Sequence, residues 1–287
     1  MPQWSPRIML HQQSDPAEFL LRARHFLEEL EAENNLLLGV SAWLATHPER
    51  IEHTPFFATV EENGKVQAAA MMTPPYHLVL SRAKKENLAL IAEHLLAKSI
   101  LPPGVNGPSQ TSQAFAELWA RRTGDEVQLH RSLQIYQIAR VVPPPPVEGR
   151  MRLAHENDAN TLIRWIHKFS VDIGESNVPD QVQAPKTLRR LLSDQRLHVW
   201  EDKELCSMSA WGAPTSHGVR ISMVYTPLEL RQRGYASACV AALSKAMLDS
   251  GKEFCCLFTD LSNPTSNRIY QRIGYRPVCD FTEYRLG

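Results

Sequence analysis

The stretch that decides the fold is Arg231-Gln232-Arg233-Gly234-Tyr235-Ala236, close to the C-terminus. An apolar run at residues 221–225 precedes it and is typical of a strand, and residues 237–248 follow it with the spacing of a helix. A strand that leads through a short glycine-containing turn into a helix presents unpaired backbone N–H groups and the positive end of the helix dipole. The stretch therefore predicts a binding site for a phosphorylated ligand.

Two common nucleotide-binding motifs do not describe this turn. Its spacing does not fit the mononucleotide loop GxxxxGK[ST], and no GxGxxG follows any expected strand. The ligand is therefore expected to be a different carrier of phosphate groups.

Composition narrows the class of protein. The chain has 287 residues, of which 43% are hydrophobic and 22% are charged, which suits one large domain or two ordinary ones. The 31 Lys and Arg residues balance the 31 Asp and Glu residues, so a formal net charge of zero supplies no field for a nucleic acid. We expect no nucleic-acid partner.

Location and redox state follow from two further patterns. No apolar stretch approaches the ~20 residues that span a bilayer, and residues 1–10 lack the apolar core of a signal peptide. We therefore expect a cytoplasmic protein with no membrane partner. The five cysteines lie in the C-terminal half without metal-ligand spacing, so we expect reduced, mostly buried thiols and no metal.

A proline-rich segment at residues 143–149, PPPPVEG, separates the two halves. Consecutive prolines favour a stiff, extended spacer. We predict one domain at residues 1–142, a linker at 143–149 and a second domain at 150–287. In the second domain the expected order is β-α-α-β-β-β-α-β-α-β, including helices at 234–249 and 264–272 and a last strand through 275–285.

The first half repeats this order without obvious sequence identity, which indicates an ancient duplication. Helices are expected at 16–32, 36–46, 84–98 and 110–122, and strands at 56–61, 65–72, 76–80, around 105, and at 127–141. After the strand at 76–80 the chain reads SRAKKE at residues 81–86, with no glycine where Gly234 stands in the second half. The first half is therefore expected to lack the phosphate turn.

Two motifs of the second half resemble a known family. Val224-Tyr225-Thr226-Pro227 followed by Arg231-x-x-Gly234-x-Ala236 resembles the acetyl-CoA-binding signature of the GCN5-related N-acetyltransferase (GNAT) superfamily. Asn263-Pro264-x-Ser266-Asn267-x-x-Tyr270-x-x-x-Gly274-Tyr275 resembles the motif that follows it. The resemblance covers residues 151–285, and the first half resembles a degenerate copy. It implies an α/β (α+β by some schemes) fold of two tandem GNAT-like domains, each with a mixed, mostly antiparallel central sheet flanked by helices.

The resemblance also implies the reaction and the residues that serve it. The implied activity is transfer of an acetyl group from acetyl-CoA to a primary amine by direct attack. We expect the acceptor amine to be a small molecule. Strand residues 223–225 would pair with the pantetheine arm, and the turn would hold the diphosphate. The expected cofactor-binding residues are Met223, Val224, Tyr225, Arg231, Gln232, Arg233, Gly234, Tyr235, Ala236, Ser237, Asn263, Ser266, Asn267 and Tyr270.

Tyr270 matches the tyrosine that, in the family, protonates the departing thiolate, and we expect it to be the catalytic acid. Asn263 and Pro264 also suit the N-cap and first position of a helix, so Asn263 has either a capping role alone or a contact with pantetheine as well. Ser266 lies four residues before Tyr270, so the two side chains are expected on one helix face.

The base and the acceptor are left open by the sequence. Residues 218–226 contain no acid, so the strand glutamate of several relatives has no counterpart here. Asp172 and Glu175 in the segment 170–184, which is expected to border the acceptor, are candidates, and an ordered water is the alternative. Phe169 could reach the acceptor but is also explained by helix packing. A non-catalytic acyl-CoA sensor or interaction module is the competing function. The sequence does not specify the acceptor, the acyl-chain preference or the oligomeric state.

Overall fold

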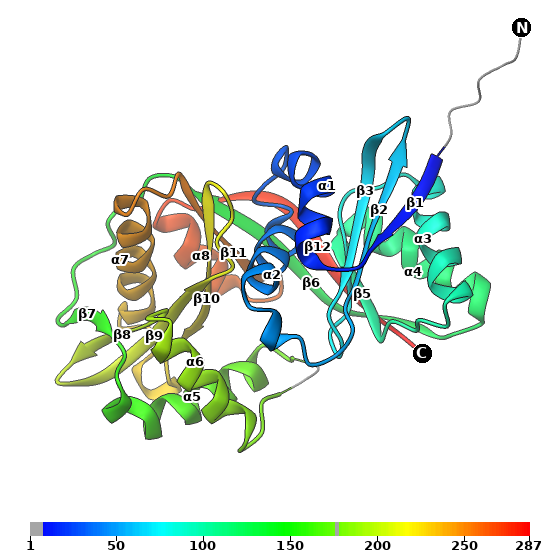
Figure 1. The fold of residues 1–287 in the computed structure, drawn as a ribbon. Coiled ribbons are helices and arrows are strands. Elements are labelled where there is room, and N and C mark those ends of the chain that lie inside the picture. The colour runs from blue at the N-terminus through cyan, green and yellow to red at the C-terminus, as the bar shows by residue number, and fades with distance from the viewer. Residues whose placement is uncertain (1–7, 176–177) are drawn as a thin grey trace, which may run out of the picture. The chain divides into compact units, whose positions relative to one another are not determined.

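The computed structural model describes residues 8–175 and 178–287, and contacts group them into two compact units (Figure 1). Unit 1 contains the described residues up to Ile135, together with Ala213–Ser216 and Val278–Gly287. Unit 2 contains Tyr136–Gly212 and His217–Pro277. Neither unit is continuous in sequence, so long-range pairing defines both.

In unit 1 a sheet has the strand order β1-β2-β3-β4-β5-β12. Neighbouring strands pair antiparallel except β4 and β5, which are parallel. The elements that the N-terminal part of the chain contributes are β1 (Ile8–Gln13), α1 (Pro16–Glu28), α2 (Asn35–Thr46), η1 (Pro48–Arg50), β2 (Phe56–Glu62), β3 (Lys65–Met72), β4 (Leu78–Leu80), α3 (Lys85–Ala97), β5 (Gly104–Pro108), α4 (Ser109–Thr123) and β6 (Val127–Ile138).

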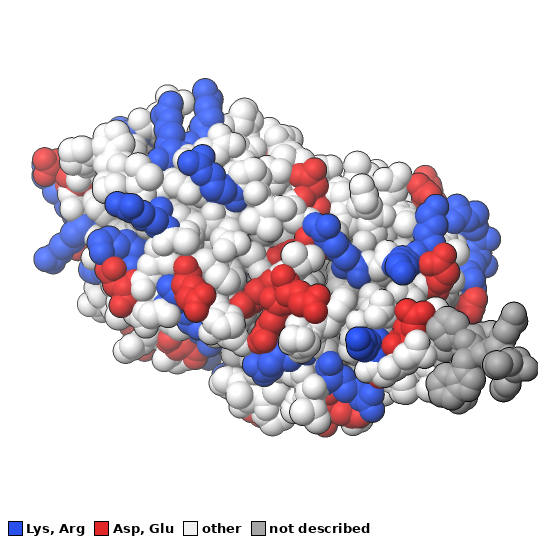
Figure 2. Space-filling model, turned by 90° about the horizontal axis from the view of Figure 1, so that it is seen from above, with Lys and Arg blue, Asp and Glu red and all other residues white. Residues whose placement is uncertain are grey.

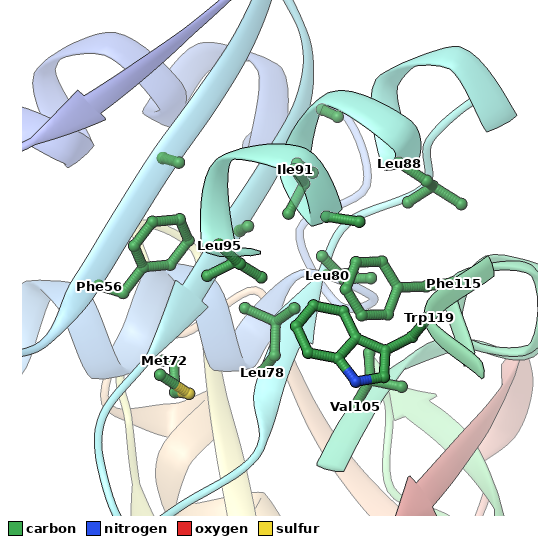
Figure 3. Close-up of a cluster of buried hydrophobic side chains, with 14 of the residues drawn as sticks. Phe56, Met72, Leu78, Leu80, Leu88, Ile91, Leu95, Val105, Phe115 and Trp119 are labelled. Atoms are coloured by element: carbon green, nitrogen blue, oxygen red, sulfur yellow. The ribbon is translucent and has the colours of Figure 1, made fainter. Parts of the chain in front are cut away.

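Both faces of the sheet in unit 1 are covered by helices, which explains why the buried part of β3, residues 68–72, is apolar at every position. On β2, Phe56 packs with the residues of α3 and α4, whereas the next residue, Phe57, packs with α1 and α2. Successive strand side chains point to opposite faces, so each strand feeds two cores. Figure 3 shows the first of these cores, in which Leu88 and Ile91 of α3 and Trp119 of α4 pack on the strands.

Unit 2 repeats this plan. The strand order is β7-β8-β9-β10-β11, with antiparallel pairs except β10 and β11, which are parallel. α5 and α6 pack in one core with β8 and β9, and α7 and α8 pack in another with β10 and β11. Its elements, with the strand that ends the chain, are β7 (Arg150–Leu153), η2 (Glu156–Asp158), α5 (Ala159–Asp172), α6 (Gln183–Ser193), β8 (Leu197–Asp202), β9 (Glu204–Gly212), β10 (Gly218–Tyr225), η3 (Leu228–Leu230), α7 (Tyr235–Asp249), β11 (Phe254–Asp260), α8 (Pro264–Arg272) and β12 (Arg276–Leu286).

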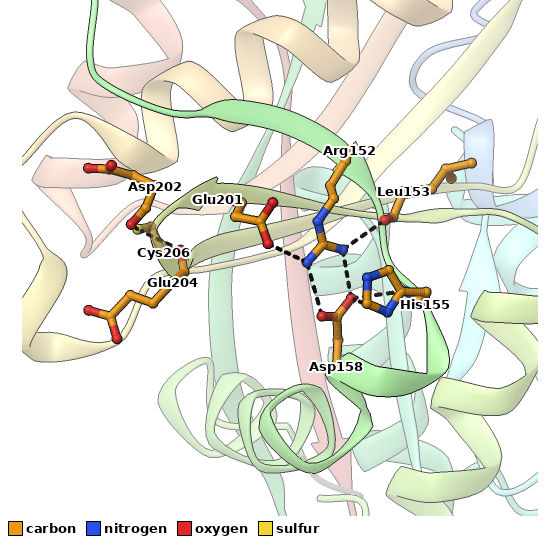
Figure 4. A network of polar contacts seen from close by, with 8 residues as sticks. All are labelled: Arg152, Leu153, His155, Asp158, Glu201, Asp202, Glu204 and Cys206. Carbon is orange, nitrogen blue, oxygen red and sulfur yellow. Dashed lines mark hydrogen bonds and ion pairs between the residues drawn. The ribbon is translucent and has the colours of Figure 1, made fainter.

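An ion cluster holds the start of unit 2 together (Figure 4). Arg152 of β7 donates to both carboxylate oxygens of Asp158, at 2.8 and 3.0 Å, and to Glu201 of β8 at 2.8 Å. Burial opposes ionisation of Asp158, but the hydrogen bonds from Arg152 outweigh it and lower the pKa of this carboxyl. The cluster thereby fixes the turn that leads into α5.

The last strand of the chain leaves the second half and joins unit 1. From Val278 onward β12 lies in unit 1, where it pairs antiparallel with β5. Conversely, residues 136–138 of β6 come from the first half and lie in unit 2, where Tyr136 packs in the same core as Tyr270. The boundary predicted at residues 143–149 falls in the loop between β6 and β7, whereas the division by contacts follows these strands rather than the order of the chain.

The fold class expected from the sequence, two α/β units with mixed, mostly antiparallel sheets flanked by helices, is confirmed. One strand was missed, and two predicted element ends differ from the structure by three or more residues. The strand β1 was not predicted, because its second half, HQQ, is polar. The helix predicted to reach residue 32 ends at Glu28, because the Asn34 side chain donates to the Leu27 carbonyl and closes the helix. β6 ends at Ile138 rather than 141, as the chain then turns and the Val142 N–H donates to the Ile273 carbonyl.

Candidate acetyl-CoA site

In unit 2, β10 and β11 pair only over the first part of their length. The parallel register runs from Gly218↔Phe254 to Arg220↔Cys256, and the rest of both strands continues without pairing to each other. Beyond this register the facing edges of β10 and β11 no longer form a ladder with each other. Residues 223–225 lie on this part of β10, where an extended arm with amide groups could pair with the strand.

The strand is also distorted at this point. Met223 has a φ of 53°, a left-handed conformation that is uncommon for a residue with a side chain, and the register between β9 and β10 shifts between Ser222 and Tyr225. The carbonyl of Tyr225 already accepts a hydrogen bond of 3.0 Å from Ser207. Of the three predicted strand residues, Met223 and Val224 are therefore the two whose carbonyls accept no hydrogen bond from a side chain of the described residues.

The turn after β10 ends at an open helix N-terminus. Gln232 and Gly234 have positive φ values of 65° and 88°, and Gly234 is the N-cap of α7. No side chain caps this helix, whereas Asp15 and Asn263 cap α1 and α8. The N–H groups of residues 235–237 lie in the first turn of α7, and within the described structure they donate to no backbone or side-chain acceptor. Such a turn suits an anion.

A glycine at position 234 is required for a structural reason, besides allowing a ligand to approach the backbone closely. A Cβ atom at this position would lie 2.7 Å from a methyl carbon of Val147, in the proline-rich segment, and the positive φ itself disfavours other residues. The neighbouring backbone is held too, because the Trp200 indole donates to the Glu148 carbonyl at 2.9 Å. The segment predicted to be a stiff, extended spacer is therefore packed against the turn.

The two arginines of the turn differ. Arg231 donates from Nε to the Thr226 carbonyl at 2.8 Å and from a terminal nitrogen to Asp172 at 2.7 Å. Arg233 is exposed, and no hydrogen bond or ion pair of its side chain is recorded among the described residues. Arg233 can therefore meet a phosphate without losing a partner, whereas Arg231 has to leave Asp172 first.

The remaining turn residues lie at the first turn of α7. Ala236 and Ser237 are half-buried there, and neither makes a side-chain hydrogen bond recorded in the described structure. The hydroxyl of Tyr235 donates to Asp202 of β8 at 2.9 Å, and this bond raises the pKa of the phenol. Tyr235 therefore contributes its backbone N–H to the turn while its side chain fastens α7 to β8.

The second motif forms α8 with the expected cap. Asn263 accepts from the Ser266 N–H at 3.1 Å, and Pro264 occupies the first turn, which confirms the capping role. Asn267 accepts from Thr259 at 2.8 Å and donates to the Asp260 carbonyl at 3.1 Å, so it ties the helix to the end of β11. Ser266 is half-buried on this helix. These contacts place the start of α8 beside the unpaired end of β11.

Tyr270 lies in the core of unit 2 with only 7% of its surface exposed. Its ring meets that of Tyr275 edge to face, with centroids 5.9 Å apart, and Tyr275 is fixed in turn by a 2.8 Å hydrogen bond with Ser244. Burial raises the pKa of Tyr270 to about 12, and no hydrogen bond of its hydroxyl is recorded within the described residues. The phenol is therefore protonated at neutral pH with its proton uncommitted.

The three predicted acceptor-side residues follow one another near the end of α5. Phe169 packs partly buried against the core formed by α5, α6, β8 and β9, as the packing alternative expected. Asp172 is half-exposed and paired with Arg231, and the Glu175 N–H donates to the Ser170 carbonyl at 3.0 Å. Residues 176 and 177 of the predicted segment 170–184 lie outside the described residues. Asp172 thus has a polar contact with a predicted cofactor residue, Arg231, and Phe169 packs in the cluster that also contains Tyr225.

The corresponding place in unit 1 is closed. A Cβ at Gly107 of β5 would lie only 2.9 Å from the Leu80 carbonyl of β4, so these strands stay in contact where β10 and β11 part. Arg82, which follows β4, forms a two-pronged pair with Glu33, whose side chain is 1% exposed. In the first half, therefore, β4 and β5 stay in contact at this place, and the arginine that follows β4 is held in an ion pair. Residues 81–86 also contain no glycine equivalent to Gly234.

Other classes of site find little support in the structure. Across residues 8–175 and 178–287, no three His, Cys, Asp or Glu side chains are grouped so that they could hold a metal ion. The cysteines are buried without a disulfide, and burial raises the pKa of Cys239 to about 12, which makes this thiol a poor nucleophile. Figure 2 shows acidic and basic side chains intermixed on the face that it presents. No helix of the described part is both long and apolar enough to cross a bilayer.

Comparison with known proteins agrees with this geometry. Residues 200–286 match the model of the family described as FR47-like protein, a stretch that includes β10, the turn, α7 and α8. A search of curated proteins found no match.

Solved structures match the chain over nearly its whole length. A Drosophila protein has a TM-score of 0.70 at 15% identity, covering 98% of this chain and 99% of its own. A GCN5-related N-acetyltransferase from Sphaerobacter thermophilus has a TM-score of 0.63 at 15% identity, covering 97% and 95%. A GNAT-family acetyltransferase from Colwellia psychrerythraea has a TM-score of 0.58 at 11% identity, covering 98% and 100%. The chain therefore has the fold of GCN5-related N-acetyltransferases in a tandem arrangement, and its residues 200–286 match the FR47-like family.

Proposed function

We propose that the protein is an acetyl-CoA-dependent N-acetyltransferase that acts on a small-molecule amine, with its site in unit 2. The observation that carries the proposal is the end of β10–β11 pairing at Arg220↔Cys256, directly before a turn that opens onto the uncapped N-terminus of α7. An unpaired strand edge suits the amides of pantetheine, and a helix N-terminus suits the diphosphate. The two features adjoin in the order in which CoA presents these groups.

The residues of this site have separable tasks in the proposal. The N–H groups of residues 235–237 and the Arg233 guanidinium hold the diphosphate. Met223 and Val224 pair with the pantetheine arm and thereby orient the thioester, which converts attack by the amine into a reaction between held partners. A bond then forms between the amine nitrogen and the acetyl carbon, the bond from that carbon to sulfur breaks, and the amine loses a proton.

Tyr270 acts on the departing sulfur. With a pKa of about 12 the phenol keeps its proton at neutral pH. Complete transfer of that proton to a thiolate with an ordinary pKa of about 8.5 would cost about 5 kcal/mol, at ~1.4 kcal/mol per pKa unit. We therefore assign Tyr270 a hydrogen bond to sulfur that strengthens as the C–S bond breaks, while the phenol keeps its own proton. The proton that the amine loses balances the one that converts the thiolate to the thiol. For the proton of the amine, Asp172 and an ordered water both remain candidates.

The proposal is tested with Tyr270→Phe, which removes one hydroxyl without altering the packed ring. We expect unchanged affinity for acetyl-CoA and a fall in kcat of ~10²-fold to 10⁴-fold, the usual worth of a positioned proton donor. Tyr275→Phe is the matched control, because it removes a buried hydroxyl that bonds Ser244 and should lower stability with little change in kcat. CoA release is measured with a panel of primary amines. A kcat of Tyr270→Phe equal to that of the wild type would contradict the assigned role.

A second function is an acyl-CoA sensor that binds without turnover. It is favoured by one observation: β10, with the sequence GVRISMVY, carries no acid, and the nearby Asp172 carboxylate is paired with Arg231. On this alternative acetyl-CoA binds saturably, yet none of the amines in the panel releases CoA above the rate of hydrolysis. CoA release with any amine decides for the enzyme.

A further inference from the structure

The Arg231–Asp172 ion pair joins the two sides of the proposed site. Arg231 belongs to the turn expected to meet the diphosphate, and Asp172 is the last residue of α5, on the side expected to meet the acceptor. Their side chains are in contact at 2.7 Å, and 42% and 47% of the two side chains are exposed. Resting on the function proposed above, we propose that the donor's diphosphate and Asp172 compete for Arg231, so that donor binding uncovers Asp172 for the ammonium group of a cationic acceptor.

The strengths of the two contacts favour this exchange. An ion pair between half-exposed side chains contributes little, because water screens both charges. A guanidinium on a diphosphate also makes charge-assisted hydrogen bonds, but it meets a group with more negative charge and more acceptor oxygens than a single carboxylate offers. The first contact is therefore the easier to give up. Arg82 in unit 1 shows the contrasting case, since its partner Glu33 is buried and holds it permanently.

The arginine also has a place to pivot. Its Nε bonds the Thr226 carbonyl at 2.8 Å, and the guanidinium carbon lies 5.8 Å from the centre of the Tyr225 ring, so the charged group rests at the end of β10. Arg231 itself starts the turn, and a long flexible side chain can redirect its charge without a change in the backbone. No rearrangement of α5 or β10 is needed.

When the Arg231 guanidinium moves away from Asp172, the carboxylate is left as a site for another cation. Asp172 lies in the last turn of α5, where the helix dipole is negative, so carboxylate and dipole both favour a positive charge. The guanidinium that now sits there shows which kind of group the position accepts. An acceptor with a second ammonium group, besides the amine that reacts, fits this position. Asp172 then holds that ammonium group, and of the two candidates for the proton of the reacting amine the ordered water is left. The substrate class that follows is a diamine or polyamine.

The first experiment measures affinity rather than activity, by calorimetric titration of CoA into the wild type, Asp172→Asn, Arg231→Gln and the double variant. Asp172→Asn should bind CoA about twofold to fivefold more tightly, the worth of an exposed ion pair. The gain should disappear in the Arg231→Gln background and for pantetheine, which has no diphosphate. Glu229→Gln is the matched control, because Glu229 is an exposed acid of the same loop with no recorded ion pair.

The outcomes separate the two proposals. Failure of the wild type to bind CoA overturns the proposed function. Wild-type binding with unchanged or weaker affinity in Asp172→Asn, or an equal gain in Glu229→Gln, overturns the competition for Arg231 alone. The second experiment titrates 1,4-diaminobutane into the protein with and without saturating CoA. Tighter binding of the diamine in the CoA complex, lost in Asp172→Asn, is expected. Equal binding in both states, or none in either, overturns the assignment of Asp172 as the acceptor's cation site.

Discussion

Glu283 gives a quantitative test of the contacts that hold β12, the last strand of the chain, in unit 1. This residue of β12 is 7% exposed and receives hydrogen bonds from His77, at 3.0 Å, and from Arg131, at 2.8 Å. Burial alone would raise its pKa, but His77 and Arg131 lower it from 4.5 to about 2. A difference of this size corresponds to about 3 kcal/mol, at ~1.4 kcal/mol per pKa unit.

The sign follows from the lowered pKa. Because the folded state holds the carboxylate ionised more strongly than the unfolded state does, the stabilisation is complete above the unfolded pKa of 4.5 and is lost as the pH falls toward 2. At pH 3 the protein should have lost about 2 kcal/mol of this contribution. In the part of the chain that the structure describes, His77 and Arg131 are the groups within ion-pair distance of this carboxylate.

The assay compares the free energy of unfolding of the wild type and Glu283→Gln, by urea denaturation at pH 7 and pH 3. Only the wild type carries the titrating group, so its advantage over the variant should shrink by about 2 kcal/mol between the two pH values. Glu52→Gln, at an exposed loop position, should show no such change and controls for the other carboxylates. An advantage of the same size at both pH values would refute the reasoning.

Two further substitutions test local parts of the account. Asn263→Ala removes the acceptor of the Ser266 N–H at the start of α8 and should lower stability by about 1 kcal/mol, measured as the free energy of unfolding; an unchanged value would mean that the cap contributes nothing. Gly107→Ala should lower the melting temperature of the protein, because its Cβ would lie 2.9 Å from the Leu80 carbonyl and cost ~1–3 kcal/mol; an equal or higher melting temperature would show that the strands of unit 1 can part.

Local patterns predicted the elements that carry the candidate site. The helix at 264–272 has the predicted bounds, since Asn263 and Pro264 specify its start by their own chemistry, and α7 begins one residue after the predicted 234. These signals lie within a few residues of each other, so they can be identified from a short stretch of sequence without knowledge of the rest of the fold. The same holds for Phe169, which packs partly buried against the core, as the helix-packing alternative predicted.

Contacts between distant residues were not predictable in the same way. Nothing in the sequence of β12 indicates that it pairs with β5, because an alternating strand can complete either sheet. The Arg231–Asp172 pair joins residues 59 positions apart, and it depends on where the end of α5 comes to lie. The positive φ of Met223 is likewise imposed by packing, since methionine has no preference for it.

The central claim is that the first turn of α7 binds the diphosphate of acetyl-CoA, and Ser237→Glu tests it most directly. Substitution of Gly234 would be ambiguous, because its positive φ and its contact with Val147 already require glycine. An acidic residue at position 237 is instead favourable for the helix, since negative charge near an N-terminus stabilises it. The same charge would repel a diphosphate.

The measurement is calorimetric titration of acetyl-CoA into the wild type and Ser237→Glu, with the melting temperature of each recorded alongside. The account predicts saturable binding to the wild type, at least a tenfold weaker affinity for the variant, and a melting temperature that does not fall. Equal affinity of the two proteins for acetyl-CoA would contradict the placement of the diphosphate at this helix.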